Sequence, residues 1–144
     1  MHATPDSIVT DQNLRKLFET ARLPASRFDH EGHVRLAWIY VTSEDLPTAI
    51  GSYCRDLQAY AASLGVPDKY HATITWFFMI LVGERVEAMP EADWETFKAA
   101  NEDLITSGKA LLSRHYSSDV LRSDTARRRF VLPDRNPTLQ SAEK

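Results

Sequence analysis

The chain has 144 residues, of which 43% are hydrophobic and 26% are charged, and its formal net charge at pH 7 is -3. A chain of this length is most simply one domain, which buries roughly two thirds of the surface of the unfolded chain. The mild charge argues against a nucleic-acid or membrane partner attracted by bulk electrostatics. The single cysteine, Cys54, excludes an intrachain disulfide, and no segment typical of export is found, so we expect a cytoplasmic protein.

The longest apolar run extends from Ile74 to Val82, where Thr75 is the only polar side chain. A helix that crosses a bilayer needs about 20 apolar residues. This run is far shorter, so we expect no transmembrane segment.

The first part of the chain predicts an arm followed by a helix. Residues 1–10 include polar residues and Pro5, and their apolar residues do not recur at helical or strand spacing, which predicts a loose N-terminal arm. Apolar residues then recur at helical spacing from Asp11 to Leu23. Pro24 predicts the end of this first helix.

Two further helices are predicted before residue 65. Asp29 has the position of an N-cap for a second helix from about His30 to Val41. Residues 42–45 contain start signals for a third helix. This helix has the clearest apolar stripe in the chain, and Gly65 predicts its end.

Asp68 has the position of an N-cap for a fourth helix, which continues to about Ala88 and becomes apolar on every face after its first turn. A helix of this kind must be buried among neighbours. A fifth helix is predicted from about Glu91 to Ile105, and short helical pieces follow it. Residues 134–144 are polar and contain proline, which predicts an irregular C-terminal tail.

The sequence has none of the alternating polar and apolar positions that are typical of strands. It therefore predicts an all-α fold in which residues 11–133 form one up-and-down bundle of about five main helices. Short connections favour antiparallel neighbours, so the second and fourth helices should begin at the same end of the bundle.

This topology predicts a histidine-rich pocket at that end. His30 and His33 open the second helix, and His71 opens the fourth, with Thr75 one turn further on. The predicted end of the fifth helix brings Glu102 to the same place. We therefore take these five residues as candidate catalytic residues of a small-molecule enzyme.

Three of these residues are also candidate metal ligands. The partial positive charge of a helix N-terminus keeps imidazole neutral, and neutral imidazole binds metal. His30, His33 and His71 are expected to hold one divalent transition metal, namely zinc, iron or copper, with Glu102 as a proton shuttle. The HEXXH pattern of many zinc enzymes is missing, because the sequence here is HEGH. Metal-free acid–base chemistry is one alternative, and histidines that only cap backbone groups or bond buried hydroxyls are another.

Two segments, FDHEGHVRLAWIYV at 28–41 and GVPDKYHATITWFFMIL at 65–81, resemble a family of small bacterial helical proteins without an assigned activity. The resemblance extends from about Phe28 to Asp134. Its motif residues correspond to His30, His33, Trp38, Tyr70, His71 and Thr75. The family pattern has an aromatic residue at the position of His115, where this chain departs from it. The resemblance implies one fold for the whole segment and no particular reaction.

Two functions of other classes remain as alternatives to an enzyme. The first is a non-catalytic binding protein for a small anionic ligand, held by adjacent helix N-termini together with Arg27, Arg35 and Lys69. The second is an interaction module, because the arginine-rich segment 122–135 has a local excess of positive charge that would suit an acidic partner or nucleic acid. Arginines on a solvated helix face explain this segment more simply, so nucleic acid is not the expected partner. The sequence leaves the oligomeric state open.

Overall fold

Helices form all the regular secondary structure in residues 10–135, the part of the chain that the computed structural model describes. The all-α prediction is therefore confirmed. No helix in this range combines the length and the apolar character that a membrane span would need. Almost all of the predicted N-terminal arm and most of the predicted C-terminal tail lie outside the described residues.

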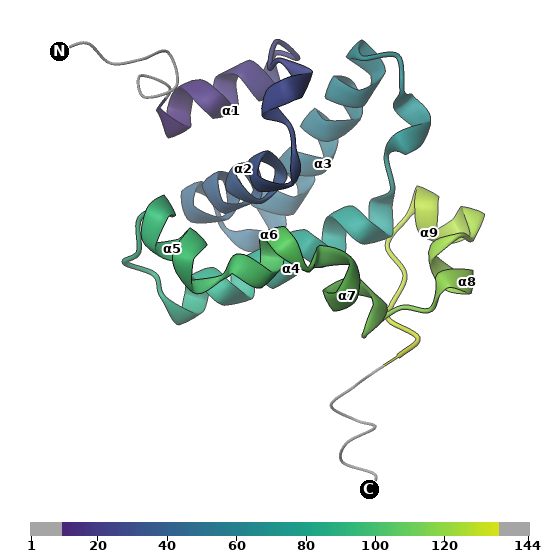
Figure 1. Cartoon of the computed structure of the whole chain (residues 1–144). Helices are drawn as coiled ribbons and strands as arrows, with labels where there is room; N and C mark the ends of the chain where they lie inside the picture. Colours follow the sequence, from purple (N-terminus) through teal and green to yellow (C-terminus); the bar gives the residue numbers. More distant parts are fainter. Residues whose placement is uncertain (1–9, 136–144) are drawn as a thin grey trace, which may run out of the picture.

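The first three helices lie close to their predicted positions (Figure 1). They are α1 (Asp11–Glu19), α2 (His30–Ser43) and α3 (Leu46–Ser63). Each begins where a side-chain oxygen accepts a hydrogen bond from a backbone N–H three residues later, and the caps are Thr10, Asp29 and Asp45.

The first helix is shorter than predicted, because it ends at Glu19 rather than at Leu23. Ala21 has a φ of 58°, which reverses the chain direction, and the N–H of Arg22 donates back to the carbonyl of Leu17 at 2.7 Å. A left-handed residue with such a backward hydrogen bond is a common way to end a helix. A 3-10 turn, η1 (Ala25–Arg27), then leads into α2.

The fourth helix, α4 (Ala72–Ala88), is capped by His71 and not by Asp68 as predicted. Asp68 lies instead in a short 3-10 turn, η2 (Pro67–Lys69). The Nδ1 atom of His71 accepts a hydrogen bond from the N–H of Ile74 at 3.2 Å. The imidazole thus satisfies the backbone group that the predicted carboxylate would have satisfied.

The predicted fifth helix is interrupted, because Asn101 leaves the helical conformation between α5 (Trp94–Ala100) and α6 (Glu102–Thr106). The side-chain amide of Asn101 donates to the carbonyl of Phe97 at 2.9 Å and accepts from Arg85 at 2.8 Å. These bonds stabilise the break. Three further short helices follow, namely α7 (Gly108–Ser113), α8 (Ser118–Leu121) and α9 (Asp124–Arg128).

The core is organised around α2, which packs against both α3 and α4. Phe18 of α1 is fully buried and its ring lies 5.3 to 5.5 Å from the rings of Phe28, Tyr53 and Tyr60. The N-terminal halves of α2 and α4 border one shared cavity. The two helices therefore begin at the same end of the bundle, as the up-and-down topology predicts.

The C-terminal part of the described chain returns to the start of α4 (Figure 1). The buried hydroxyl of Thr73 donates to the carbonyl of Arg129 at 2.9 Å. Asp134, which the sequence placed in an irregular tail, accepts a hydrogen bond from the N–H of Ser117 at 2.8 Å. Residues 129–135 are thus part of the fold and fix α8 and α9 beside α4.

Candidate functional site

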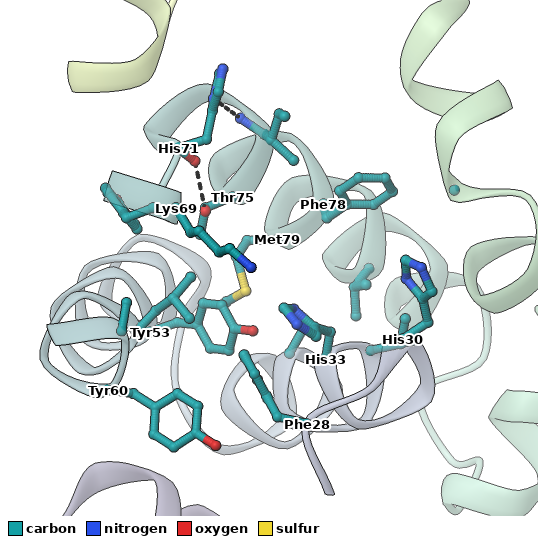
Figure 2. A pocket seen from close by; sticks show the side chains of 18 of the residues that line it. Phe28, His30, His33, Tyr53, Tyr60, Lys69, His71, Thr75, Phe78 and Met79 are labelled. Carbon is teal, nitrogen blue, oxygen red and sulfur yellow. Dashed lines mark hydrogen bonds between the residues drawn. The ribbon is translucent and has the colours of Figure 1, made fainter. Parts of the chain in front are cut away.

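A cavity of about 640 Å³ lies between the N-terminal halves of α2 and α4, the C-terminal half of α3, and α7 (Figure 2). Its volume falls in the range of small-molecule binding sites. Most of its wall is apolar and is formed by residues that include Phe28, Ala37, Leu57, Phe78, Met79 and Val82.

The charged and titratable groups of the cavity are unevenly distributed. The lining contains two lysines, Lys69 and Lys109, together with three of the histidines. Among the described residues that line it, none is an aspartate or a glutamate. The chain as a whole is acidic, with a formal net charge of -3, so the sign of charge in this cavity is opposite to that of the protein.

His33 lies in the wall of the cavity. Its ring stacks on that of Phe28, with centroids 3.7 Å apart and an interplanar angle of 24°. The residue is exposed to solvent, but its ring packs against Phe28 in a concave wall, which removes part of its hydration. The resulting loss of hydration lowers the pKa of His33 to about 4, the nearby His30 adds to this effect, and Asp29 opposes it. His33 is therefore neutral near pH 7.

Tyr53 is a site residue that the sequence analysis did not select. It belongs to the apolar stripe of α3 and is only 4% exposed, yet its hydroxyl points into the cavity toward His33 (Figure 2). Within residues 10–135 this hydroxyl has no hydrogen-bond partner. Burial raises the pKa of Tyr53, so it remains a neutral donor. The only signal in the sequence was a phenol on an inward helix position.

Tyr60, two turns further along α3, provides a contrast. It also lines the cavity, but its hydroxyl donates to the carbonyl of Leu23 at 2.8 Å. This hydroxyl already has a partner in the fold. Of these two tyrosines, therefore, only Tyr53 presents a hydroxyl without a protein partner to the cavity.

His71 and Thr75 border the same cavity but have structural partners. The ring of His71 points away from the cavity (Figure 2), and its Nε2 lies 2.7 Å from the carbonyl oxygen of Leu121. Since Nδ1 accepts from Ile74, these two bonds assign the proton to Nε2. The hydroxyl of Thr75 donates to the carbonyl of His71 at 2.8 Å. Both side chains thus stabilise the start of α4.

The expected three-histidine metal site is not assembled in the described part of the chain. No group of three or more His, Cys, Asp or Glu side chains within residues 10–135 is arranged so that it could hold a metal ion. His30 and His33 border the cavity from α2, whereas both ring nitrogens of His71 are bonded to backbone groups. The parallel start of α2 and α4 was predicted correctly, but not the direction of the His71 ring.

Glu102, the predicted proton shuttle, lies outside the cavity. It is exposed in the first turn of α6 and is not among the residues that line the cavity. Its neighbour Asp103 forms an ion pair with Arg85 at 2.9 Å. Because Arg85 lies about four helical turns after His71 on α4, this region is distant from the start of that helix.

The arginine-rich segment 122–135 is engaged in local contacts. Arg122 pairs with Asp119 at 3.0 Å, and Arg128 pairs with Asp124 at 2.9 Å. Arg127 donates to the backbone carbonyl of Asp68. These contacts correspond to the simpler interpretation of the segment as a solvated surface.

Comparison with known proteins adds no functional assignment, because no family model, no curated protein and no solved structure matches this chain. The geometry and chemistry of the cavity are therefore the basis for a functional proposal.

Proposed function

We propose that this protein binds a small, mainly apolar organic acid in the cavity between α2, α3 and α4. The observation that supports this most directly is the lining, which combines apolar walls with Lys69 and Lys109 and includes no carboxylate among the described residues. Burial of the apolar part of a ligand contributes about 25 cal/mol per Å² of area removed from water. The two ammonium groups favour a ligand of negative charge.

The charge preference comes mainly from Lys69. It lies in η2, and its ammonium group points toward the interior of the cavity (Figure 2). The residue is exposed and keeps much of its hydration when no ligand is bound. Pairing with a carboxylate should therefore contribute modestly to affinity, by about 1 kcal/mol. Its main effect should be a preference for anionic over uncharged ligands.

Binding is better supported than acid–base catalysis at this site. A general base is most effective when its pKa lies near the working pH, and the pKa of His33 is lowered to about 4. A neutral imidazole of this kind is a weak base. It can still donate one hydrogen bond and accept another, which suits recognition of a ligand.

The proposal can be tested with acids and their uncharged counterparts. We would measure thermal stabilisation and calorimetric affinity with octanoate and 3-phenylpropanoate, and with the amide of each. A ligand at 100 times its Kd stabilises the folded state by about 2.7 kcal/mol. We expect stabilisation by at least one acid and a weaker effect of its amide. Lack of stabilisation by either acid at millimolar concentration, or equal affinity for the amides, would overturn the proposal.

A pair of charge-reversed variants makes the test specific to the cavity. Lys69→Glu should weaken binding of the acid about tenfold, because it removes an attraction of about 1 kcal/mol and adds a repulsion, and a total of about 1.4 kcal/mol changes affinity by that factor. Lys16→Glu makes the same change on the exposed surface of α1, outside the cavity. Equal losses in the two variants would show that the effect comes from net charge and not from the site.

A further inference from the structure

The hydroxyl that Tyr53 presents to the cavity is the starting point for a more specific assignment. A hydroxyl without a protein partner is left to bond either water or a ligand. Tyr53 is 4% exposed, and its hydroxyl points into the cavity and has no hydrogen-bond partner in residues 10–135. A ligand atom that accepts a hydrogen bond at this point would satisfy it.

Two other polar groups face the same part of the cavity. The imidazole of His33 lies opposite the Tyr53 hydroxyl, and the ammonium group of Lys69 points toward the space beside them (Figure 2). The three groups come from α2, α3 and η2. The tertiary fold thus brings together a neutral phenol, a neutral imidazole and one cation in this part of the cavity, and the second cation of the lining, Lys109, comes from α7.

The charge of this cluster limits the ligand class. One ammonium group balances one negative charge, and the phenol and the neutral imidazole can each donate one hydrogen bond. A carboxylate has one charge and two acceptor oxygens, which matches these groups. A phosphate monoester has a charge of about -1.5 to -2 near pH 7 and is usually bound by several cationic donors.

The apolar part of the ligand has a matching surface. Phe78, Met79 and Val82 lie on the cavity side of α4 at helical spacing, and Leu104 and Leu112 border the same cavity. From Phe78 to Val82 the helix rises by about 6 Å. Met79 is flexible and can adapt to ligands of different shape.

We infer that Tyr53, His33 and Lys69 form a recognition site for a single carboxylate, so that the ligand class is an apolar monocarboxylic acid rather than a phosphate ester. This inference rests on the proposed function and adds to it the chemical class of the ligand head and the residues that hold it.

The test uses titration calorimetry to compare three ligands that share one alkyl chain and differ in the head group, namely octanoate, octan-1-ol and octyl phosphate. We expect wild-type protein to bind octanoate at least tenfold more tightly than the other two. Tyr53→Phe removes a hydroxyl without a protein partner, so its melting temperature should not fall. The variant should bind octanoate about tenfold more weakly, the loss typical of a hydrogen bond to a charged group. Its affinity for octan-1-ol should change much less.

The matched control is Tyr60→Phe, on the same helix. It removes a hydroxyl that is already bonded to Leu23, so it should lower the melting temperature and keep the ratio of octanoate to octan-1-ol affinities. Octanoate binding that is unchanged in Tyr53→Phe, or tighter binding of octyl phosphate by the wild type, would overturn the carboxylate site but not the proposed function. If neither octanoate nor 3-phenylpropanoate binds to the wild type, the proposed function itself fails, and the inference fails with it.

Discussion

Acidification from pH 7 to pH 4 should destabilise the protein through His33. The pKa of this imidazole is about 4 in the folded protein, against an ordinary value of 6.5. Between these two values the unfolded chain binds a proton that the folded chain does not. Stability therefore falls as the pH decreases from about 6.5 to about 4, and the contribution of His33 is constant above and below that window.

The magnitude follows from the width of the window. A difference of 2.5 pH units between 6.5 and about 4 corresponds to at most about 3.4 kcal/mol at 1.36 kcal/mol per unit. Because His33 is exposed to solvent, solvent screening reduces this value. We expect a loss of roughly 1 to 2 kcal/mol.

Urea unfolding at several pH values between 4 and 7 would measure this effect. In His33→Gln the slope of unfolding free energy against pH should decrease over this window. Ion-paired carboxylates also stabilise the fold, and one of them is Asp103, whose pKa is lowered by the hydrogen bond with Arg85. Their contribution to stability is lost at lower pH, and equally in the wild type and in His33→Gln. NMR titration provides a direct check, because the His33 ring should titrate near pH 4. A slope that is equal in the two proteins, together with titration of His33 near 6.5, would refute the reasoning.

Four further substitutions test the fold around the site. Tyr40→Phe should cost about 1.5 to 3 kcal/mol, because the Tyr40 hydroxyl donates to the buried carboxylate of Asp56 at 2.7 Å; an unchanged urea midpoint would contradict this. Thr73→Val removes a buried hydroxyl that bonds the C-terminal segment, so hydrogen exchange in that segment should accelerate and stability should fall by about 1 to 3 kcal/mol; unaltered exchange would argue against this anchor. Gly32→Ala should lower the melting temperature, because the new Cβ would lie 2.2 Å from a backbone carbonyl oxygen. Gly51→Ala, where the new Cβ would have no atom within 4 Å, should raise stability by about 0.5 to 1 kcal/mol. The opposite order of stabilities would refute the steric argument.

Local sequence patterns were sufficient to predict where the first three helices begin. Asp29 caps α2 as expected, and Asp45, one of the start signals at 42–45, caps α3, because a cap and the backbone N–H groups that it bonds lie within a few residues of one another. Short connections predicted the shared orientation of α2 and α4, since they favour antiparallel neighbours and leave few arrangements. The break at Asn101 could not be predicted in this way, because the side chain that stabilises it, Arg85, lies 16 residues earlier in the chain.

The same distinction holds for the site. Helical periodicity and capping are local properties, and they predicted an all-α fold. Short connections predicted a common end for His30, His33 and His71. The roles of these residues at that end depend on contacts between distant segments. His71 turns away from the cavity because its Nε2 meets the carbonyl of Leu121, 50 residues further along the chain. Tyr53 belongs to the cavity because α3 packs against α2 and α4, and whether a helix face meets a neighbour or a cavity depends on packing between distant segments.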